Sequence, residues 1–134
     1  MALEIDYSGK RVVVTGSGAG IGRSIAVMFA QAGADVVIFD KREDKVQETV
    51  EQINASGGGS AFPVIGDARE EGQIEKMFDE AVELLGGIDV GINNIGMLGP
   101  QGTASLIDMD ESKWRDVLEQ NLLVTALSIK AEAK

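Results

Sequence analysis

Short apolar runs alternate along the chain with longer stretches that have helical periodicity. Four runs rich in Val and Ile are continuous rather than alternating, which is typical of strands buried on both faces. They cover residues 11–15, 35–39, 61–65 and 88–92. Between them, apolar residues recur at helical spacing over residues 21–32, 43–55 and 70–85, and again from 110 to 134. The pattern predicts the order β-α-β-α-β-α-β-loop-α.

Strands that are separated by helical crossovers form a parallel sheet with right-handed connections. The sequence therefore predicts an α/β fold, a Rossmann-like doubly wound parallel sheet. Pro63 lies inside the third apolar run, and proline is confined to edge strands because it cannot donate to the ladder. We expect a truncated sheet with strand order 3-2-1-4 and the last helix at the C-terminus.

Composition narrows the functions that this fold can carry. The 134 residues include 12 basic and 22 acidic side chains, and the net charge of −10 argues against a nucleic-acid partner. No apolar run approaches about 18 residues and the N-terminus lacks a basic, apolar signal segment. We therefore expect no membrane partner and a cytoplasmic location. The chain contains neither cysteine nor histidine, so it predicts no disulfide, no metal site and no Ser-His mechanism.

The chain is rich in glycine, with 17 residues of 134, and four of them follow the first predicted strand. Three are spaced as Gly-x-x-x-Gly-x-Gly, at Gly16, Gly20 and Gly22, with Gly18 between them. Such glycines allow a tight turn, close approach of a phosphate and close packing of the helix, whose N-terminus attracts the pyrophosphate. A P-loop is excluded because no Lys-[Ser/Thr] pair follows. A glycine-rich turn without a ligand is the structural alternative.

Asp40 ends the second predicted strand, 18 residues after Gly22. This matches the acid that accepts a hydrogen bond from the ribose 2′-hydroxyl of a dinucleotide. A 2′-phosphate about 4 Å from that carboxylate would be repelled by about 4 kcal/mol at an effective dielectric constant near 20, which favours NAD over NADP. Lys41 and Arg42 follow, and either can bind a phosphate if Asp40 turns away. Alternatively, Asp40 is the N-cap of the next helix.

These residues resemble motifs of the short-chain dehydrogenase/reductase family. The segment TGSGAGIG at 15–22 resembles the cofactor loop Thr-Gly-x-x-x-Gly-x-Gly, and NNIG at 93–96 resembles the motif Asn-Asn-Ala-Gly, with Ile95 in place of Ala. Asp67 matches the family's adenine-contacting Asp, and Asn121 matches its helix Asn. The resemblance covers nearly the whole chain, but only the first half of the family's pattern. It implies that residues 1–134 form the N-terminal, dinucleotide-binding half of a Rossmann-type domain.

The resemblance implies a nicotinamide cofactor and hydride transfer between an alcohol and a carbonyl. The residues that it assigns to cofactor binding are Gly16, Ser17, Gly18, Gly20, Ile21, Gly22, Asp40, Lys41, Asp67, Ala68, Asn94, Ile95 and Gly96. The family's chemistry uses a Tyr, a Lys four residues later and an upstream Ser, with the helix Asn positioning water in a proton relay. The only tyrosine is Tyr7, with Arg11 four residues on. Asn121 is therefore the only catalytic residue carried over, and the chain alone is predicted to be inactive.

Each assignment has a structural alternative. Asp67-Ala-Arg-Glu70 also matches a capping box for the following helix, and the alternative role of Asn93 and Asn94 is to satisfy backbone groups of their loop. Asn121 lies on an apolar stripe of the last helix, where a hydrogen bond to sheet backbone is the alternative role. The stripe also contains Trp114, Val117, Leu118, Leu122 and Thr125. The loop 97–102 is expected to border the substrate.

The last helix carries apolar residues beyond this stripe, at Leu123, Val124 and Leu127. A helix that is apolar on most sides is buried on more than one side, and the open edge of the fourth strand attracts partners. We expect a homo-oligomer or pairing with a C-terminal half. The leading hypothesis is an NAD-dependent dehydrogenase represented by its N-terminal half. The rivals are a non-catalytic dinucleotide-binding module and an assembly fragment that binds nothing.

Overall fold

The computed structural model describes residues 4–97 and 105–134. A four-stranded parallel sheet forms its centre, with the order β3-β2-β1-β4. The strands are β1 (Arg11–Thr15), β2 (Asp35–Asp40), β3 (Ala61–Ile65) and β4 (Val90–Ile92). The predicted parallel sheet and its strand order are confirmed, and Pro63 lies on the edge strand β3 as expected.

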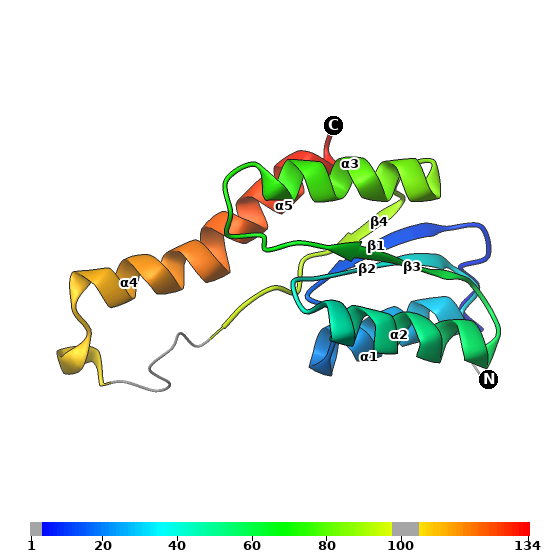
Figure 1. The fold of residues 1–134 in the computed structure, drawn as a ribbon, viewed down its shortest axis with the longest axis horizontal. Helices are drawn as coiled ribbons and strands as arrows, with labels where there is room; N and C mark the ends of the chain where they lie inside the picture. The colour runs from blue at the N-terminus through cyan, green and yellow to red at the C-terminus, as the bar shows by residue number, and fades with distance from the viewer. Residues whose placement is uncertain (1–3, 98–104) are drawn as a thin grey trace.

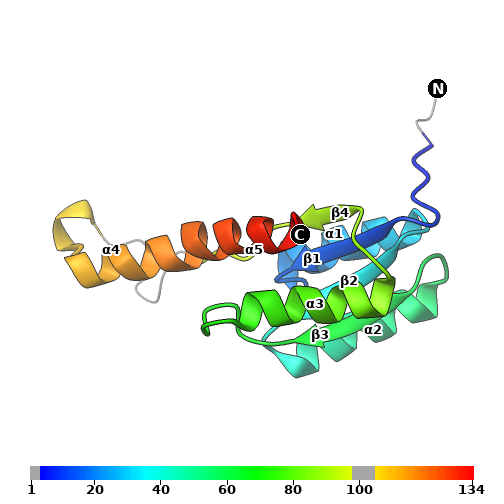
Figure 2. The same ribbon diagram turned by 90° about the horizontal axis from the view of Figure 1, so that it is seen from above.

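Helices cover both faces of the sheet (Figures 1 and 2). One face carries α1 (Gly20–Gln31) and α2 (Glu43–Ser56), and the other carries α3 (Gln73–Leu85) and α5 (Val124–Glu132). A π-helical turn, η2 (Glu119–Leu123), joins α5 to α4 (Glu111–Leu118), which extends beyond the sheet, and a short 3-10 turn, η1 (Leu106–Asp108), precedes α4. The last helix is therefore interrupted, where the sequence predicts a single helix.

The core explains why the strand sequences are continuous apolar runs. Successive side chains of a strand point to opposite faces. Val12 and Val14 of β1 pack in the cluster under α1 and α2, whereas Val13 packs in the cluster under α3 and α5. All three side chains are fully buried. Both faces of β1 therefore require apolar residues.

Two predicted boundaries are wrong, at the start of α3 and at the start of β4. Helix α3 begins at Gln73 rather than Glu70, because Gly72 adopts a left-handed conformation (φ 75°) directly before it. The expected capping box is absent, since the Asp67 carboxylate accepts from the backbone N–H of Arg69 at 3.0 Å, within a turn. Strand β4 begins at Val90, two residues later than predicted.

The apolar stripe of the last helix is largely exposed. Trp114, Leu118 and Leu122 have exposed fractions of 43%, 50% and 63%. Within the described residues, β4 pairs with β1 alone, so its outer edge is open. No helix in the described part of the chain has the length and apolar character needed to span a membrane.

Candidate functional site

The loops that leave the sheet at the carboxyl ends of the strands surround a cavity of about 370 Å³. Ligands of open α/β sheets bind outside this edge, because the loops of neighbouring strands meet there. The lining residues are Gly16, Asp40, Lys41, Arg42, Gly66, Asp67, Ala68, Arg69, Asn94, Ile95, Gly96, Met97 and Gln120. Eight of the residues assigned from the sequence therefore meet in one place: Gly16, Asp40, Lys41, Asp67, Ala68, Asn94, Ile95 and Gly96.

The glycine loop has the geometry that its spacing predicts. Gly16 and Gly20 have φ angles of 67° and 59°, a region that favours glycine. A Cβ on Gly22 would overlap the carbonyl oxygen of Gly16 and lie 2.6 Å from Nδ2 of Asn94. The first turn of α1 thus packs directly on the loop. Its N–H groups have no partners within the helix, as at any helix N-terminus.

The other predicted loop residues lie beside the cavity without lining it. The buried Ser17 hydroxyl donates to the Val14 carbonyl oxygen at 2.6 Å and accepts from the Phe39 N–H at 3.0 Å. The Ser17 side chain therefore joins β1 to β2. Ile21 is 75% exposed at the start of α1. Gly18 lies in the turn before α1, and Gly20 and Gly22 belong to the first turn of α1.

Arg23 supports this loop, a role that the sequence motifs do not reveal. Its guanidinium donates to the Gly18 carbonyl oxygen through Nε at 3.0 Å and Nη2 at 2.5 Å. The Thr49 hydroxyl donates to the same oxygen at 3.1 Å. Thr49 is 31 residues from Gly18 in the sequence, so only the folded chain reveals the arrangement.

Asp40 lies at the base of the cavity with only 6% of its surface exposed. Its Oδ1 accepts from the backbone N–H and Nε of Arg42, both at 3.1 Å. Its Oδ2 accepts from the Gly18 N–H at 3.1 Å and from Arg42 Nη2 at 3.0 Å. The N-cap alternative is wrong, because the residue at the N-cap of α2 is Arg42 and Asp40 instead binds Arg42.

Burial raises the pKa of Asp40, but the hydrogen bonds and charge of Arg42 and the Gly18 N–H outweigh burial and hold this pKa below its usual value. Asp40 is consequently ionised at neutral pH. Because the folded-state pKa is depressed, the stabilisation is present above the unfolded value of about 3.9 and is lost as the pH falls through the folded-state pKa.

The remaining charged residues of the cavity are paired in the same way. Lys41 Nζ lies 3.7 Å from an oxygen of Asp67. Arg69 donates to Glu119 at 3.1 Å and to Asp116 at 2.6 Å. The cavity thus contains Lys41, Arg42 and Arg69 close to carboxylates, and positive charge at its wall is balanced by neighbouring negative charge.

Asn94 connects the loop after β4 to the glycine loop. Its side-chain Nδ2 donates to the carbonyl oxygens of Thr15 and Gly16, both at 3.2 Å. The Thr15 hydroxyl accepts from the N–H groups of Asn94 at 3.0 Å and Ile95 at 3.3 Å. The alternative role in satisfying loop backbone is thus correct for Asn94, although Asn94 also lines the cavity.

Asn93 points toward helix α5 instead. Its Nδ2 donates to Glu132 at 3.2 Å. Burial raises the pKa of Glu132, although this hydrogen bond opposes the shift. Asn93 Oδ1 and Glu132 Oε1 are buried without a hydrogen-bond partner among the described residues. The two asparagines of the motif therefore hold their loop from opposite sides.

Asn121 lies in the π-helical turn and holds the end of the same loop. Its Oδ1 accepts from the Met97 N–H at 3.0 Å, and its Nδ2 donates to the carbonyl oxygens of Met97 at 2.7 Å and Val117 at 2.9 Å. The structural alternative, a hydrogen bond to sheet backbone, is wrong, because the partner Met97 is a loop residue that lines the cavity. The rest of the loop expected to border the substrate, residues 98–102, lies outside the described residues.

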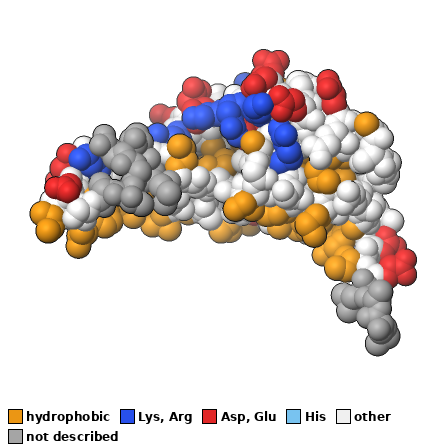
Figure 3. All heavy atoms as spheres, turned by 90° about the horizontal axis from the view of Figure 1, so that it is seen from below, with side chains coloured by type: hydrophobic (Ala, Val, Ile, Leu, Met, Phe, Trp, Pro, Cys, Tyr) orange, Lys and Arg blue, Asp and Glu red, His pale blue; other side chains and the backbone are white. Residues whose placement is uncertain are grey.

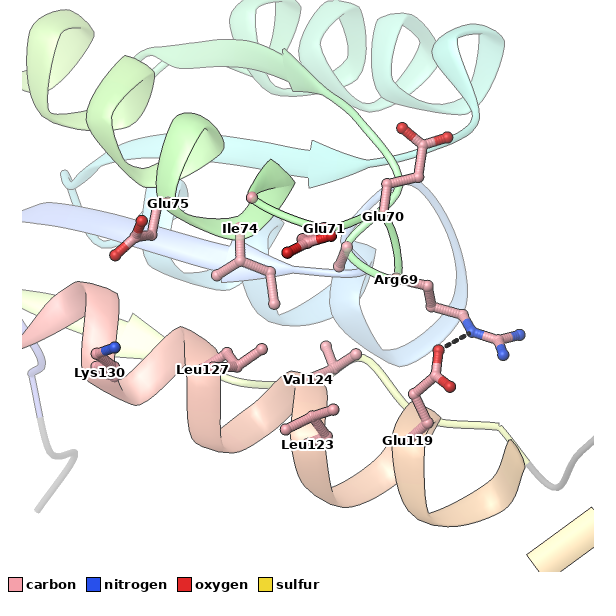
Figure 4. A pocket seen from close by; sticks show the side chains of 12 residues that line it. Arg69, Glu70, Glu71, Ile74, Glu75, Glu119, Leu123, Val124, Leu127 and Lys130 are labelled. Atoms are coloured by element: carbon pink, nitrogen blue, oxygen red, sulfur yellow. Dashed lines mark hydrogen bonds and ion pairs between the residues drawn. The ribbon is translucent and has the colours of Figure 1, made fainter. Parts of the chain in front are cut away.

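A second cavity, of about 410 Å³, lies between α3 and the last helix (Figure 4). Ile74, Leu123, Val124 and Leu127 line its apolar part, and the ion pair of Arg69 with Glu119 lies at one end. It is slightly larger than the first cavity but has no part of the glycine loop or Asp40 in its wall. The first cavity is therefore the candidate site.

A doubly wound parallel sheet with a glycine loop at its first helix and an acid at the end of its second strand defines a Rossmann-type dinucleotide-binding fold. A family model described as short chain dehydrogenase matches residues 10–133. The chain belongs to the short-chain dehydrogenase/reductase family.

The chain is also similar in sequence to individual oxidoreductases. The chain is 38% identical over 114 residues to a 7alpha-hydroxysteroid dehydrogenase of Escherichia coli K12, a match that covers 85% of this chain and 43% of that protein. An uncharacterized oxidoreductase of Thermotoga maritima is 43% identical over 94 residues, covering 70% and 36%. The chain therefore spans less than half the length of these relatives.

Solved structures share the fold. A hydroxysteroid dehydrogenase from Escherichia coli has a TM-score of 0.87 and 34% identity, covering 97% of this chain and 53% of that chain. A 7 alpha-hydroxysteroid dehydrogenase complexed with NADH and 7-oxo glycochenodeoxycholic acid has a TM-score of 0.88 and 33% identity, covering 99% and 51%.

Proposed function

We propose that this chain binds NAD(H) in the cavity at the carboxyl edge of the sheet, as the cofactor-binding part of an oxidoreductase. The observation that carries the proposal is the convergence of the glycine loop, Asp40 and the loop 93–96 on one cavity. The residues fit such a group, since Gly16 brings backbone without a side chain to the cavity wall and the cations Lys41 and Arg42 line the same cavity. The relative complexed with NADH supports the choice of a nicotinamide dinucleotide.

The residues have distinct roles in this proposal. The glycine loop and the first turn of α1 would receive the pyrophosphate through backbone N–H groups. Asp40 would accept hydrogen bonds from ribose hydroxyls, and Asp67 and Ala68 would lie at the adenine end. The rest of the cofactor would be bordered by the loop residues Asn94, Ile95 and Gly96. When bound, the cofactor would accept a hydride from the carbon of an alcohol as NAD, or give one to the carbon of a carbonyl as NADH.

We further propose that residues 1–134 form the N-terminal half of a Rossmann-type domain and do not turn over alone. The family's Tyr and Lys pair has no counterpart in the sequence, where Tyr7 is the only tyrosine. A phenol ordinarily has a pKa near 10 and needs a neighbouring cation to act as a base at neutral pH. Asn121 holds the loop beside the cavity and would take part in a proton relay only when that pair is supplied.

The test is an assay for NADH formation from NAD and a panel of small alcohols. We expect no turnover by the 134-residue chain, and turnover once a C-terminal half bearing Ser and Tyr-x-x-x-Lys from a relative is added. Turnover by the chain alone would contradict the claim that its chemistry is incomplete. NADH binding without restored turnover would favour a non-catalytic module, and absence of NADH binding would favour a structural fragment.

We also propose that the exposed apolar residues of α4 and of the π-helical turn η2 are covered in a homo-oligomer. Leu118 and Leu122 are at least half exposed, and apolar patches of this kind mark interfaces. Light scattering at micromolar concentration is expected to give a mass above that of one chain, and a monomer mass would contradict this proposal. We expect the assembly in the cytoplasm, with neither membrane nor nucleic acid as a partner.

A further inference from the structure

The carboxylate of Asp40 has no acceptor position left for a ligand. An ionised carboxylate offers about four lone-pair sites. Four protein donors occupy them: the Gly18 N–H, the Arg42 N–H, and Nε and Nη2 of Arg42, at 3.0–3.1 Å. The backbone donors are fixed by the glycine loop and by the start of α2. Only the two bonds from the Arg42 guanidinium can be released without changing the backbone.

We propose that the Arg42 guanidinium competes with the ribose hydroxyls for Asp40 and thereby determines how strongly the site prefers NAD over NADP. This inference rests on the proposed function. Asp40 can accept from a ribose diol only after Arg42 swings away. The Arg42 side chain is half exposed, with 49% of its surface accessible, and both residues line the cavity. Its release therefore requires no movement of buried groups.

The charges around Asp40 also indicate that Arg42 affects the preference between NAD and NADP. A carboxylate without a paired cation at the ribose would repel a 2′-phosphate. The structure instead pairs that carboxylate with a guanidinium whose planar, multiple donors match phosphate oxygens. Lys41 also lines the cavity, 3.7 Å from Asp67. In Figure 3, Lys and Arg side chains gather in one band on the face shown, with Asp and Glu side chains beside them.

Arg42 therefore has opposite effects on the two cofactors. It opposes NAD, because the ribose hydroxyls must displace it from Asp40. It favours NADP, because a displaced guanidinium can pair with the 2′-phosphate while Asp40 still disfavours it. The site thus prefers NAD by less than Asp40 alone would give.

Calorimetric titration with NADH and NADPH tests this inference on the full 134-residue chain and on Arg42→Ala. We expect Arg42→Ala to bind NADH about fivefold more tightly and NADPH about tenfold more weakly, as the loss of charged hydrogen bonds implies. Arg42→Lys keeps the charge but cannot donate to both carboxylate oxygens in a fork. It is therefore expected to retain NADPH affinity and to bind NADH more tightly than the parent chain.

Arg115→Ala is the matched control, because it removes the same charge from an exposed pair with Glu111 and Arg115 does not line the cavity. Its two affinities should equal those of the parent chain. An unchanged ratio in Arg42→Ala, with circular dichroism confirming the fold, would overturn this inference and leave the proposed function intact. Binding of neither cofactor by the parent chain and by Arg42→Ala would overturn both.

Discussion

Gly22→Val is expected to lower the free energy of unfolding by about 3 kcal/mol, the upper part of the range for overpacking, and to abolish measurable NADH binding. Helix propensity alone predicts the opposite sign, since glycine inside a helix is about 1 kcal/mol less favourable than alanine. At Gly22 the steric overlap outweighs the gain in helix propensity. A Cβ at this position would overlap the Gly16 carbonyl oxygen and approach Asn94 Nδ2 to 2.6 Å. Backbone must move to accommodate it, and the glycine loop moves with it.

Urea unfolding followed by circular dichroism measures the stability, and Gly9→Val provides the control. Gly9 has a φ of 75°, and a Cβ at this position would meet nothing within 4 Å, so this variant reports conformational strain without a clash. It should cost about 1–2 kcal/mol and leave NADH affinity unchanged. Equal stability of Gly22→Val and the parent chain would show that α1 does not pack on the glycine loop.

Asn94→Asp is expected to destabilise the chain by about 3 kcal/mol at neutral pH, because a carboxylate replaces a donor that serves two carbonyl oxygens. Those oxygens belong to Thr15 and Gly16, each 3.2 Å from Nδ2. The substitution hardly changes the size of the side chain, so the effect isolates hydrogen bonding and charge. The same change places a negative charge beside the proposed pyrophosphate site, and NADH affinity should fall with stability.

The destabilisation should depend on pH. In the folded chain, the ionised form of the new carboxyl would face two carbonyl oxygens, so its pKa would be raised. A raised folded-state pKa gives stability that is present below the unfolded value of about 3.9 and lost as the pH rises through the folded-state pKa. The difference between Asn94→Asp and the parent chain should therefore be smaller at pH 4 than at pH 8.

Asn54→Asp is the matched control for this series. Asn54 Oδ1 accepts from the Ala61 N–H at 2.9 Å, a bond that a carboxylate keeps, and its Nδ2 makes only a long bond of 3.4 Å to the Ala61 carbonyl oxygen. This variant should lose no more than about 1 kcal/mol. A loss at Asn94 no greater than that at Asn54 would contradict the proposed role of the Asn94 amide.

The sequence predicts the sheet well because its signals are local. Continuous Val-rich runs identify strands with two buried faces, and Pro63 identifies an edge strand. The glycine spacing similarly predicts the turn, since the positive φ angles of Gly16 and Gly20 are a property of those residues. Asp40 follows from its distance along the chain after the last of these glycines.

Other features depend on contacts that periodicity does not encode. Helix α3 starts late because Gly72 turns the chain in place of the expected capping box. The π-helical turn at Glu119–Leu123 contains Asn121, whose partner Met97 lies 24 residues away. The stripe through Leu118 and Leu122 is exposed in the single chain. Apolar spacing identifies a face without showing what covers it.

The charge state of the cavity at the carboxyl edge of the sheet is the feature that sequence reasoning could least predict. Adjacent acidic and basic residues at positions 40–42 allow both an isolated Asp40 and a paired one. The structure shows the paired arrangement. Asp40 is only 6% exposed, and the Arg42 guanidinium donates to both of its carboxylate oxygens. This pairing changes the expected selectivity, although Asp40 keeps its place in the proposed site.

The most direct test of the central claim is an NMR titration of the ¹⁵N-labelled chain with NADH. A single dinucleotide site predicts that amide signals shift together and saturate at one NADH per chain. The shifts should be confined to the loop 16–22, residues 40–42, residues 66–68 and the loop 94–97, with signals of α3 and of the outer turns of α4 unchanged. The absence of shifts at millimolar NADH, or shifts centred on the cavity between α3 and α5, would contradict the account.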